Sequence, residues 1–427
     1  MKHHTTPLKT RSGLVAALDI GTTKICCLIA RANVDLGPNK PKGLKIIGIG
    51  HHVSKGLRSG TVVDLEDTEA SIRTTVEAAE QMAGENIHEV VVNLSGGQPE
   101  SRLIAYEISI AGHEIGDADL RRILDPQVLK NGLQKERELV HTIPVGYSID
   151  GHRGVRDPRG MFGERLSVNM HIISALSGPV RNLETSVQRC HLGLEDKVVS
   201  AYASALSTLS DDEIQLGVTV VDMGGGTTSI AVFFDGELVH TDILPIGGVH
   251  VTNDIARGLS TPLAQAERMK TLYGSAMPSS SDDREIIKVP LVGEEKTAEV
   301  SQVPRSMLVS IIRPRIEETL EMVRGRLEEA GFDKVAGRRV VLTGGASQLP
   351  GVRELAGTLI DKQVRMGRPR AIEGMPEAIA GPAFATSAGL LHYAVSNRAE
   401  APSAAYCPPE QMNHRFGRLG QWIRENF

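Results

Sequence analysis

The sequence has little of the features that mark several specialised protein classes. Its 427 residues include only four cysteines, Cys26, Cys27, Cys190 and Cys407, without a CxxC pair or a histidine-flanked spacing, which argues against a disulfide framework and a zinc site. No apolar run reaches the roughly 18 to 20 residues that span a bilayer, and the polar N-terminus lacks the hydrophobic region of a signal peptide. We therefore expect the chain to stay in the cytosol.

Charge imbalance and aromatic residues are also scarce. Lys and Arg number 47 against 52 Asp and Glu, a net charge of −5, so nucleic acid is not an expected partner of the whole chain. Aromatic residues make up 3% of the sequence, yet Phe416, Trp422 and Phe427 all fall near the C-terminus. With 41% hydrophobic and 23% charged residues, the composition is that of an ordinary folded protein, and the length predicts about two to four domains.

The hydrophobic pattern occurs twice along the chain. In the first copy it predicts strands at 14–20, 24–30 and 45–50, a helix at 64–83 and a buried strand at 90–94. In the second copy it predicts strands at 217–222, 229–234 and 239–246 and a helix at 249–258. The chain therefore looks internally duplicated, and two such α/β halves would form a cleft between them.

Two excursions interrupt this plan. In the first half about 75 residues separate the strand at 90–94 from the next buried strand, which is room for a subdomain. Its pattern predicts a strand at 102–110, a helix at 117–130 and strands at 138–147 and 165–173. In the second half the excursion runs from about Val249 to a long helix that ends near Ala330.

An acidic residue followed by glycine and threonine stands at the same turn of each copy. Asp19-Ile20-Gly21-Thr22-Thr23 aligns with Asp222-Met223-Gly224-Gly225-Gly226-Thr227-Thr228. Glycine lets backbone N–H groups approach phosphate oxygens, and a carboxylate can hold hydrated magnesium. One such turn is equally typical of an ordinary hairpin. Two at matching positions favour a magnesium-bound, phosphate-bearing ligand, with Lys24 as an added positive charge.

A third glycine turn follows a predicted buried strand at 340–343. Gly344 and Gly345 carry no side chain, so a flat base or ribose could lie against their backbone. The sequence contains no GxxxxGK[ST] motif, and Gly224-Gly225-Gly226 leads into a strand and not into a helix. Neither a Walker A loop nor a dinucleotide-binding fingerprint is therefore present.

These three elements, in this order, resemble the actin, Hsp70 and sugar-kinase superfamily. The additional subdomain follows the strand at 90–94, whereas actin carries its insertion between the third strand and the first helix. This position resembles bacterial FtsA, the actin homologue of cell division. The likeness extends from about Gly13 to Phe427 and includes residues 90–97, 218–232, 340–351 and 388–393.

The resemblance implies an α/β, actin-like fold of two duplicated halves around a nucleotide cleft, with ATP and Mg²⁺ as ligands. It implies that Asp19 and Asp222 lie near Mg²⁺, probably through water. The implied nucleotide contacts are Gly21, Thr22, Thr23, Lys24, Gly224, Gly225, Gly226, Thr227, Glu267, Lys270, Gly344 and Gly345. Without the family context, Glu267 and Lys270 are as readily a solvated surface pair. No catalytic residue follows, and ATP hydrolysis would be weak at most.

The C-terminal residues predict an amphipathic helix that lies on a membrane surface. At about 100° per residue, Met412, Phe416, Leu419, Ile423 and Phe427 share a stripe of about 80°. Trp422 lies beside the stripe and arginines flank it, a composition typical of helices in the headgroup plane. The alternative is a helix docked on the body of the protein or on a partner.

The family resemblance also implies the partners, the location and the domain organisation. The expected partners are the C-terminal peptide of the tubulin-like protein FtsZ, further copies of the chain in filaments, later division proteins and an anionic membrane, and the expected location is the cytoplasmic face of the inner membrane at the division site. The alternatives are an actin-like pilus-assembly component and a sugar or acetate kinase. The expected first half comprises core residues 13–97 and 172–214, the inserted subdomain 98–171 and a return to the core at 379–398. The expected remainder comprises second-half core residues 215–248 and 305–378, a subdomain at 249–304, a linker at 399–411 and a membrane helix at 412–427.

Overall fold

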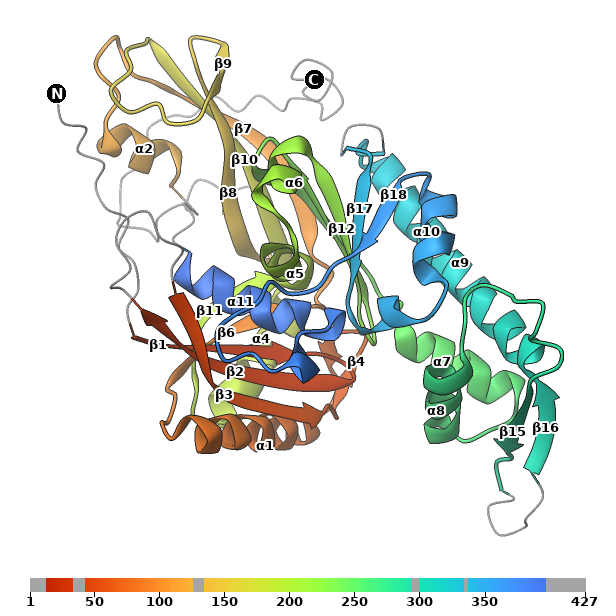
Figure 1. Cartoon of the computed structure of the whole chain (residues 1–427). Helices are drawn as coiled ribbons and strands as arrows, with labels where there is room; N and C mark the ends of the chain where they lie inside the picture. Colours follow the sequence, from red (N-terminus) through yellow and green to blue (C-terminus); the bar gives the residue numbers. More distant parts are fainter. Residues whose placement is uncertain (1–12, 34–42, 126–133, 294–299, 334–336, 397–427) are drawn as a thin grey trace.

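The computed structural model describes residues 13–33, 43–125, 134–293, 300–333 and 337–396 (Figure 1). The predicted linker at 399–411 and the predicted membrane helix at 412–427 lie outside these residues. Among the helices of the described part, none is long and apolar enough to cross a membrane.

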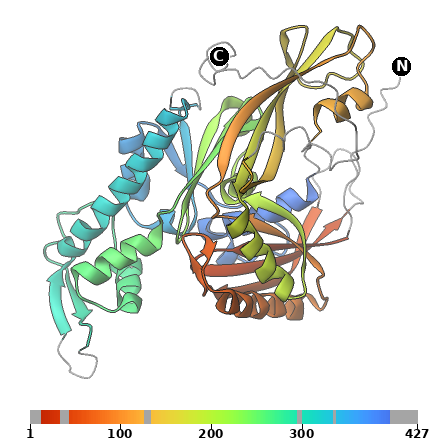
Figure 2. The ribbon, with the colours of Figure 1, turned by 180° about the vertical axis from the view of Figure 1, so that it is seen from behind.

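A five-stranded sheet forms the centre of the first half. Its strand order is β11–β6–β1–β2–β3, in which β1 pairs antiparallel with β2 and parallel with β6. The strands are β1 (Gly13–Ile20), β2 (Lys24–Asn33), β3 (Gly43–Val53), β6 (Glu89–Leu94) and β11 (Gly193–Val199). Helices α1 (Leu65–Ala83) and α4 (Ser177–Arg189) pack side by side against one face, as the view from behind shows (Figure 2). As the sequence predicts, Asp64 caps α1 by accepting hydrogen bonds from the amides of Glu66 and Asp67.

The second half repeats this sheet. Its strand order is β14–β13–β12–β17–β18, with β12 antiparallel to β13 and parallel to β17. The strands are β12 (Val218–Met223), β13 (Thr228–Phe234), β14 (Glu237–Leu244), β17 (Arg339–Thr343) and β18 (Gln363–Met366). Each sheet thus has one hairpin, one further antiparallel strand and two parallel strands in the same spatial order, so the predicted duplication is confirmed.

Two helices made of small residues lie between the sheets. Helix α5 (Ser200–Thr208) and helix α11 (Ala385–Val395) pack closely, and a Cβ added at Gly389 would lie only 1.7 Å from the carbonyl oxygen of Ala203. Glycine is therefore required at this crossing. The surrounding hydrophobic core contains buried residues of both sheets, such as Ala17 and Phe233, so one core joins the two halves.

The predicted inserted subdomain has its own sheet and its own hydrophobic core (Figure 1). Its elements are β7 (Glu100–Ser109), α2 (Asp117–Ile123), β8 (Arg137–Ile149), β9 (His152–Val155) and β10 (Arg165–Leu176), with the strand order β7–β10–β8–β9. The prediction that the helix runs to residue 130 was wrong, because α2 ends at Ile123 and the next residue, Leu124, leaves helical geometry. The sequence did not predict β9, which is too short and polar for a periodic signal.

The second-half excursion extends away from the sheet (Figure 1). It contains α7 (Gly248–Gly258), α8 (Leu263–Tyr273), the antiparallel strands β15 (Ile286–Pro290) and β16 (Val300–Pro304), and α9 (Arg305–Glu329). The predicted helix at 249–258 and the long helix ending near Ala330 are both confirmed. The remaining helices and strands are β4 (Leu57–Arg58), β5 (Thr61–Val62), α6 (Asp211–Leu216) and α10 (Val352–Ile360).

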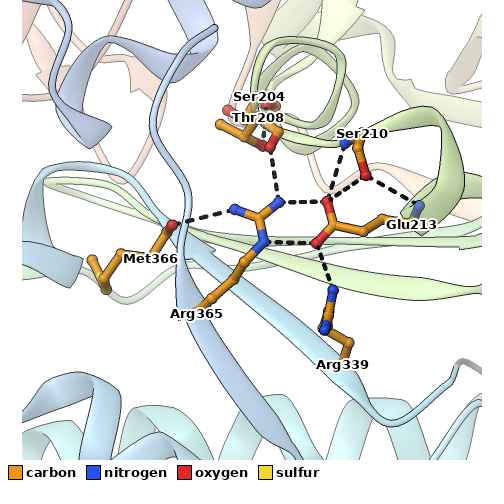
Figure 3. Close-up of polar contacts among 7 residues, drawn as sticks. All are labelled: Ser204, Thr208, Ser210, Glu213, Arg339, Arg365 and Met366. Atoms are coloured by element: carbon orange, nitrogen blue, oxygen red, sulfur yellow. Dashed lines mark hydrogen bonds and ion pairs between the residues drawn. The ribbon is translucent and has the colours of Figure 1, made fainter.

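A buried carboxylate fastens the connection between the halves to the second sheet (Figure 3). Glu213 of α6 accepts hydrogen bonds from Nε and Nη2 of Arg365 on β18, and it also caps its own helix through Ser210. The same guanidinium donates to the carbonyl oxygens of Thr208, at the end of α5, and of Met366. The chain segment that links the two halves is therefore anchored by an ion pair whose carboxylate is only 9% exposed.

Candidate functional site

Two buried carboxylates stand at corresponding places in the two halves. Asp19 is the penultimate residue of β1 and Asp222 the penultimate residue of β12, and each residue is 6% exposed. Burial raises the pKa of both carboxyl groups, and Lys24 lowers them in part. The negative charge of Asp19 raises the pKa of Asp222 further, because the two groups lie close enough to repel. A cation between them would relieve that repulsion.

Hydroxyl groups of the two central helices hold these carboxylates. Ser387 Oγ of α11 donates to Asp19 Oδ2 at 2.7 Å. Thr386 Oγ1 donates to Asp222 Oδ2 at 3.0 Å, and Ser204 Oγ of α5 donates to the same oxygen. Sequence reasoning missed these three residues, although small hydroxyl residues within the alanine- and glycine-rich stretches of both helices were a signal that could have revealed them.

The two glycine and threonine turns have the same hydrogen-bonded form. The amide of Gly21 donates to the carbonyl oxygen of Lys24 at 3.0 Å, and the amide of Gly224 donates to that of Thr227 at 2.8 Å. The alignment of the two motifs predicted this correspondence, and the backbone geometry confirms it.

The same two turns touch each other across the halves. A Cβ added at Gly225 would lie 2.5 Å from the side chain of Thr23, and one added at Gly226 would lie 2.3 Å from Thr22 Oγ1. Both positions therefore require glycine, and backbone amides of the two halves converge on one place.

Lys24 is directed toward the segment that leads into α11. Its ammonium group donates to the carbonyl oxygen of Ala383 and lies 3.6 Å from the ring centroid of Phe384. The positive charge is thus held beside Asp19, whose pKa it lowers.

The third glycine turn lies directly against Asp222. Gly344 has a φ of +84°, and a Cβ there would lie 2.3 Å from Asp222 Oδ1 and 2.5 Å from the carbonyl oxygen of Met223. Gly345 begins a short 3₁₀ helix and has space beside it, since a Cβ there would lie 3.7 Å from Ala383. The structure therefore brings this turn to the same site as the two phosphate-type turns.

Glu267 and Lys270 of α8 meet the start of α7. Lys270 Nζ lies 2.7 Å from Glu267 Oε2, 2.8 Å from Thr252 Oγ1 and 3.1 Å from the carbonyl oxygen of Gly248. The lysine side chain is 16% exposed, so this is not an ordinary solvated pair. A Cβ at Gly248 would lie 3.2 Å from Ala346 Cβ, which places the pair beside the third glycine turn.

Helix α7 begins at the second turn. The amides of Gly248 and Val249 donate to the carbonyl oxygens of Gly224 and Gly225 at 3.0 and 2.8 Å. Gly247 has no room for a side chain, because a Cβ would lie 2.6 Å from the oxygen of Gly224. The Gly247-Gly248 pair was a signal in the sequence that we did not use.

The donor set suits a hydrated metal better than a fully protein-bound one. Within the described residues no group of three or more His, Cys, Asp or Glu side chains could hold a metal ion. Two carboxylates and converging amides match magnesium that keeps several waters and binds phosphate oxygens. The predicted membrane residues Met412, Phe416, Leu419, Trp422, Ile423 and Phe427 lie outside the described part of the chain.

Comparison with known proteins gives the same answer for the two parts of the chain that carry distinct motifs. Residues 219–389 match the family described as cell division protein FtsA. Residues 96–174 match the family described as the SHS2 domain inserted in FtsA. The second match covers the inserted sheet, which places that sheet in a known domain family.

Solved structures show that the fold is actin-like. The type IV pilus biogenesis complex PilM–PilN gives a TM-score of 0.64 at 17% identity and covers 91% of this chain and 100% of that chain. MreB5 of Spiroplasma citri, solved with ADP, gives 0.53 at 12% identity and covers 91% of this chain and 97% of that chain. At these identities the likeness concerns the fold alone.

Curated relatives match over almost the full length. Cell division protein FtsA of Rhizobium meliloti is 44% identical over 98% of this chain and 96% of the relative. The proteins of the same name from Pseudomonas aeruginosa and Escherichia coli K12 are 35% and 32% identical, each over 97% of this chain and 98% of the relative. Two motif-bearing halves, the inserted domain and this full-length similarity lead to one conclusion: the chain belongs to the FtsA family of actin-like cell-division proteins.

Proposed function

We propose that the chain binds ATP with Mg²⁺ between its two halves. The observation that carries this proposal is the pair of buried carboxylates, Asp19 and Asp222, at the point where two hydrogen-bonded glycine turns meet. Gly21, Thr22, Thr23, Gly225, Gly226 and Thr227 would bind phosphate through backbone amides and hydroxyl groups, while Gly344, Gly345, Glu267 and Lys270 would bind the adenosine. Bound magnesium would supply positive charge that neutralises the phosphate oxygens, and the two aspartates would hold its water shell.

Calorimetry with Mg·ATP tests this assignment. Asp222→Asn keeps the size of the side chain and acceptors for Ser204 and Thr386, yet it removes the charge that magnesium needs. We expect ATP affinity to fall by at least about tenfold, since hydrogen bonds to charged groups contribute about 1.5–3 kcal/mol, while the circular dichroism spectrum stays that of the wild type. Unchanged Mg·ATP affinity in the variant would contradict the assignment.

We further propose that residues 412–427 attach the chain to the cytoplasmic face of the membrane. The support is the apolar stripe with its flanking arginines, together with membership of a cell-division family. A chain ending at residue 411 should fail to float with anionic vesicles and should still bind ATP. Trp422 is the only tryptophan, so a blue shift of its fluorescence on adding vesicles, weakened by Phe416→Glu, reports this segment alone. Emission already blue-shifted without lipid would indicate docking on the body instead.

The division role we propose is to tether FtsZ to that membrane. The C-terminal peptide of FtsZ would bind the subdomain at 249–304, copies of the chain would polymerise, and the inserted subdomain at 98–171 would contact neighbouring copies or later division proteins. Capture of an FtsZ tail peptide, with a scrambled peptide as the control, tests the first contact. Electron microscopy on a lipid monolayer with and without ATP tests polymerisation.

The two alternative functions have less support. The pilus complex shares the fold at 17% identity, whereas relatives that match nearly the whole chain at 32–44% are named as cell-division proteins. A sugar or acetate kinase would need a substrate-directed catalytic carboxylate, and neither aspartate is assigned that role here. An ATP-turnover assay with and without a panel of sugars and acetate distinguishes this case.

A further inference from the structure

A cavity of about 240 Å³ lies between the two halves, next to the glycine turns. The first half contributes Thr22 and residues of the β4–β5 hairpin, and the second half contributes Gly226 and residues of α7 and α9. Because Thr22 and Gly226 belong to the two turns already described, the cavity is continuous with that site. Its volume far exceeds the roughly 30 Å³ that one water occupies, so it has room for a small ion with its hydration.

The lining is rich in positive charge. Three arginines, Arg58, Arg257 and Arg315, share it with a single carboxylate, Asp254. Arg315 is already paired, since it donates to both carboxylate oxygens of Asp254 and also to Glu318. Within the described part of the chain, neither Arg58 nor Arg257 has a side-chain hydrogen bond or an ion pair. Two unpaired cations, one from each half, therefore border the same cavity.

The backbone that carries Arg58 is fixed to the first glycine turn. Ser59 and Gly60 both have positive φ, +45° and +75°, which is typical of a two-residue hairpin turn. The amide of Gly60 donates to Thr22 Oγ1 at 3.0 Å, and a Cβ at Gly60 would lie 2.2 Å from the carbonyl oxygen of Ser95. The hairpin is thus clamped between two parts of the first half, and Arg58 borders the cavity from a rigid support.

The second half adds a further hydrogen-bond donor. His250, which lines the cavity, accepts a hydrogen bond at Nδ1 from the amide of Gly247 at 3.1 Å. In the neutral ring, that bond puts the proton on Nε2, which makes Nε2 a donor. Cations and donors without a matching anion indicate that the cavity is suited to a ligand of opposite charge.

We propose that this cavity binds a phosphate-class anion through Arg58 and Arg257. Identification of that anion as the terminal phosphate of ATP rests on the proposed function, and in that case the two arginines distinguish ATP from ADP. Since one arginine comes from each half, an anion here also links the halves across the cleft. Free inorganic phosphate has the same chemistry and is the other possible source.

Calorimetry on the full chain with Mg·ATP and with Mg·ADP tests the proposal. Arg58→Ala and Arg257→Ala should each weaken ATP binding by about tenfold or more, the usual effect of losing a hydrogen bond to a charged group, and change ADP binding less than about twofold. Arg58→Lys, which keeps the charge but loses the two-pronged geometry, should fall between. Arg181→Ala is the control, because Arg181 is an exposed arginine of the first half with no side-chain partner among the described residues.

A second titration distinguishes the two sources of the anion. Inorganic phosphate added to the ADP-bound wild type should bind detectably only if the cavity accepts free phosphate, and Arg58→Ala should abolish that binding. Equal loss of ATP and ADP binding in both alanine variants, or no loss in either, would overturn the proposal. If the wild type binds no nucleotide, the proposed function fails, and thermal stabilisation by inorganic phosphate alone decides this inference: stabilisation lost in Arg58→Ala supports it, and its absence in the wild type refutes it.

Discussion

Glu213 offers the sharpest test of how the two halves are held together. Its carboxylate accepts bonds of 2.7 and 2.5 Å from Arg365, and the amide of Ser210 donates to it at 3.0 Å. Burial alone would raise the pKa of Glu213, but the bonds from Arg365 and Ser210 outweigh it and lower the pKa to about 2. Glu213→Gln keeps the size of the side chain and removes the charge, so it isolates the ionic contribution of this contact.

The size of the effect follows from that pKa. A decrease from 4.5 to about 2 corresponds to an upper limit of about 3 kcal/mol at about 1.36 kcal/mol per unit. The side chains of Arg365 and Arg339 are 36% and 53% exposed, and solvent screens such pairs, so we expect about 1 to 2 kcal/mol at pH 7. Because the folded-state pKa is depressed, this contribution is present above about pH 4.5 and is lost as the pH falls toward 2.

Urea unfolding followed by circular dichroism measures the effect. Glu213→Gln should lower the free energy of unfolding at pH 7, and the difference from the wild type should shrink near pH 3. Glu354→Gln is the matched control, because Glu354 pairs with Arg353 on the surface at about half exposure of both side chains, where such pairs contribute about 0 to 1 kcal/mol. Equal losses in the two variants, or a loss in Glu213→Gln that does not depend on pH, would refute the reasoning.

Three further predictions concern the glycine turns and the buried histidines. Gly225→Val should abolish Mg·ATP binding measured by calorimetry, because its Cβ would lie 2.5 Å from Thr23 and force the turns apart; retained affinity would mean that phosphate binds elsewhere. Gly344→Ala should reduce the thermal midpoint more than Gly84→Ala, since both have positive φ but only Gly344 faces the carboxylate of Asp222, whereas nothing lies within 4 Å of a Cβ at Gly84; equal shifts would contradict this. Burial lowers the pKa of His171 to about 3 and that of His240 to about 4, so below about pH 6.5 the unfolded chain binds protons that the folded chain does not, and the free energy of unfolding should fall by up to about 1.4 kcal/mol per pH unit for each histidine. Replacing His240, which stacks on Phe332, by phenylalanine should make that pH dependence shallower in urea titrations.

The sequence determined the local elements and their duplication. Alternation and buried apolar runs identified β1, β2, β12 and β13, because strand periodicity depends only on which faces are buried. The paired motifs at Asp19 and Asp222 also follow from sequence, since glycine and threonine after a strand indicate a tight turn wherever they occur. The end of α2 was predicted seven residues too late, because helix periodicity does not reveal where the chain leaves helical geometry.

Only the tertiary structure decided what faces these motifs. Ser204, Thr386 and Ser387 reach the two carboxylates because α5 and α11 cross between the sheets, and sequence separations of 18, 164 and 368 residues leave no local pattern that predicts such contacts. The same holds for Arg58 and Arg257, which border one cavity from opposite halves. Side-chain hydrogen bonds depend on distances set by packing of the whole core, whereas secondary structure depends mainly on neighbours along the chain.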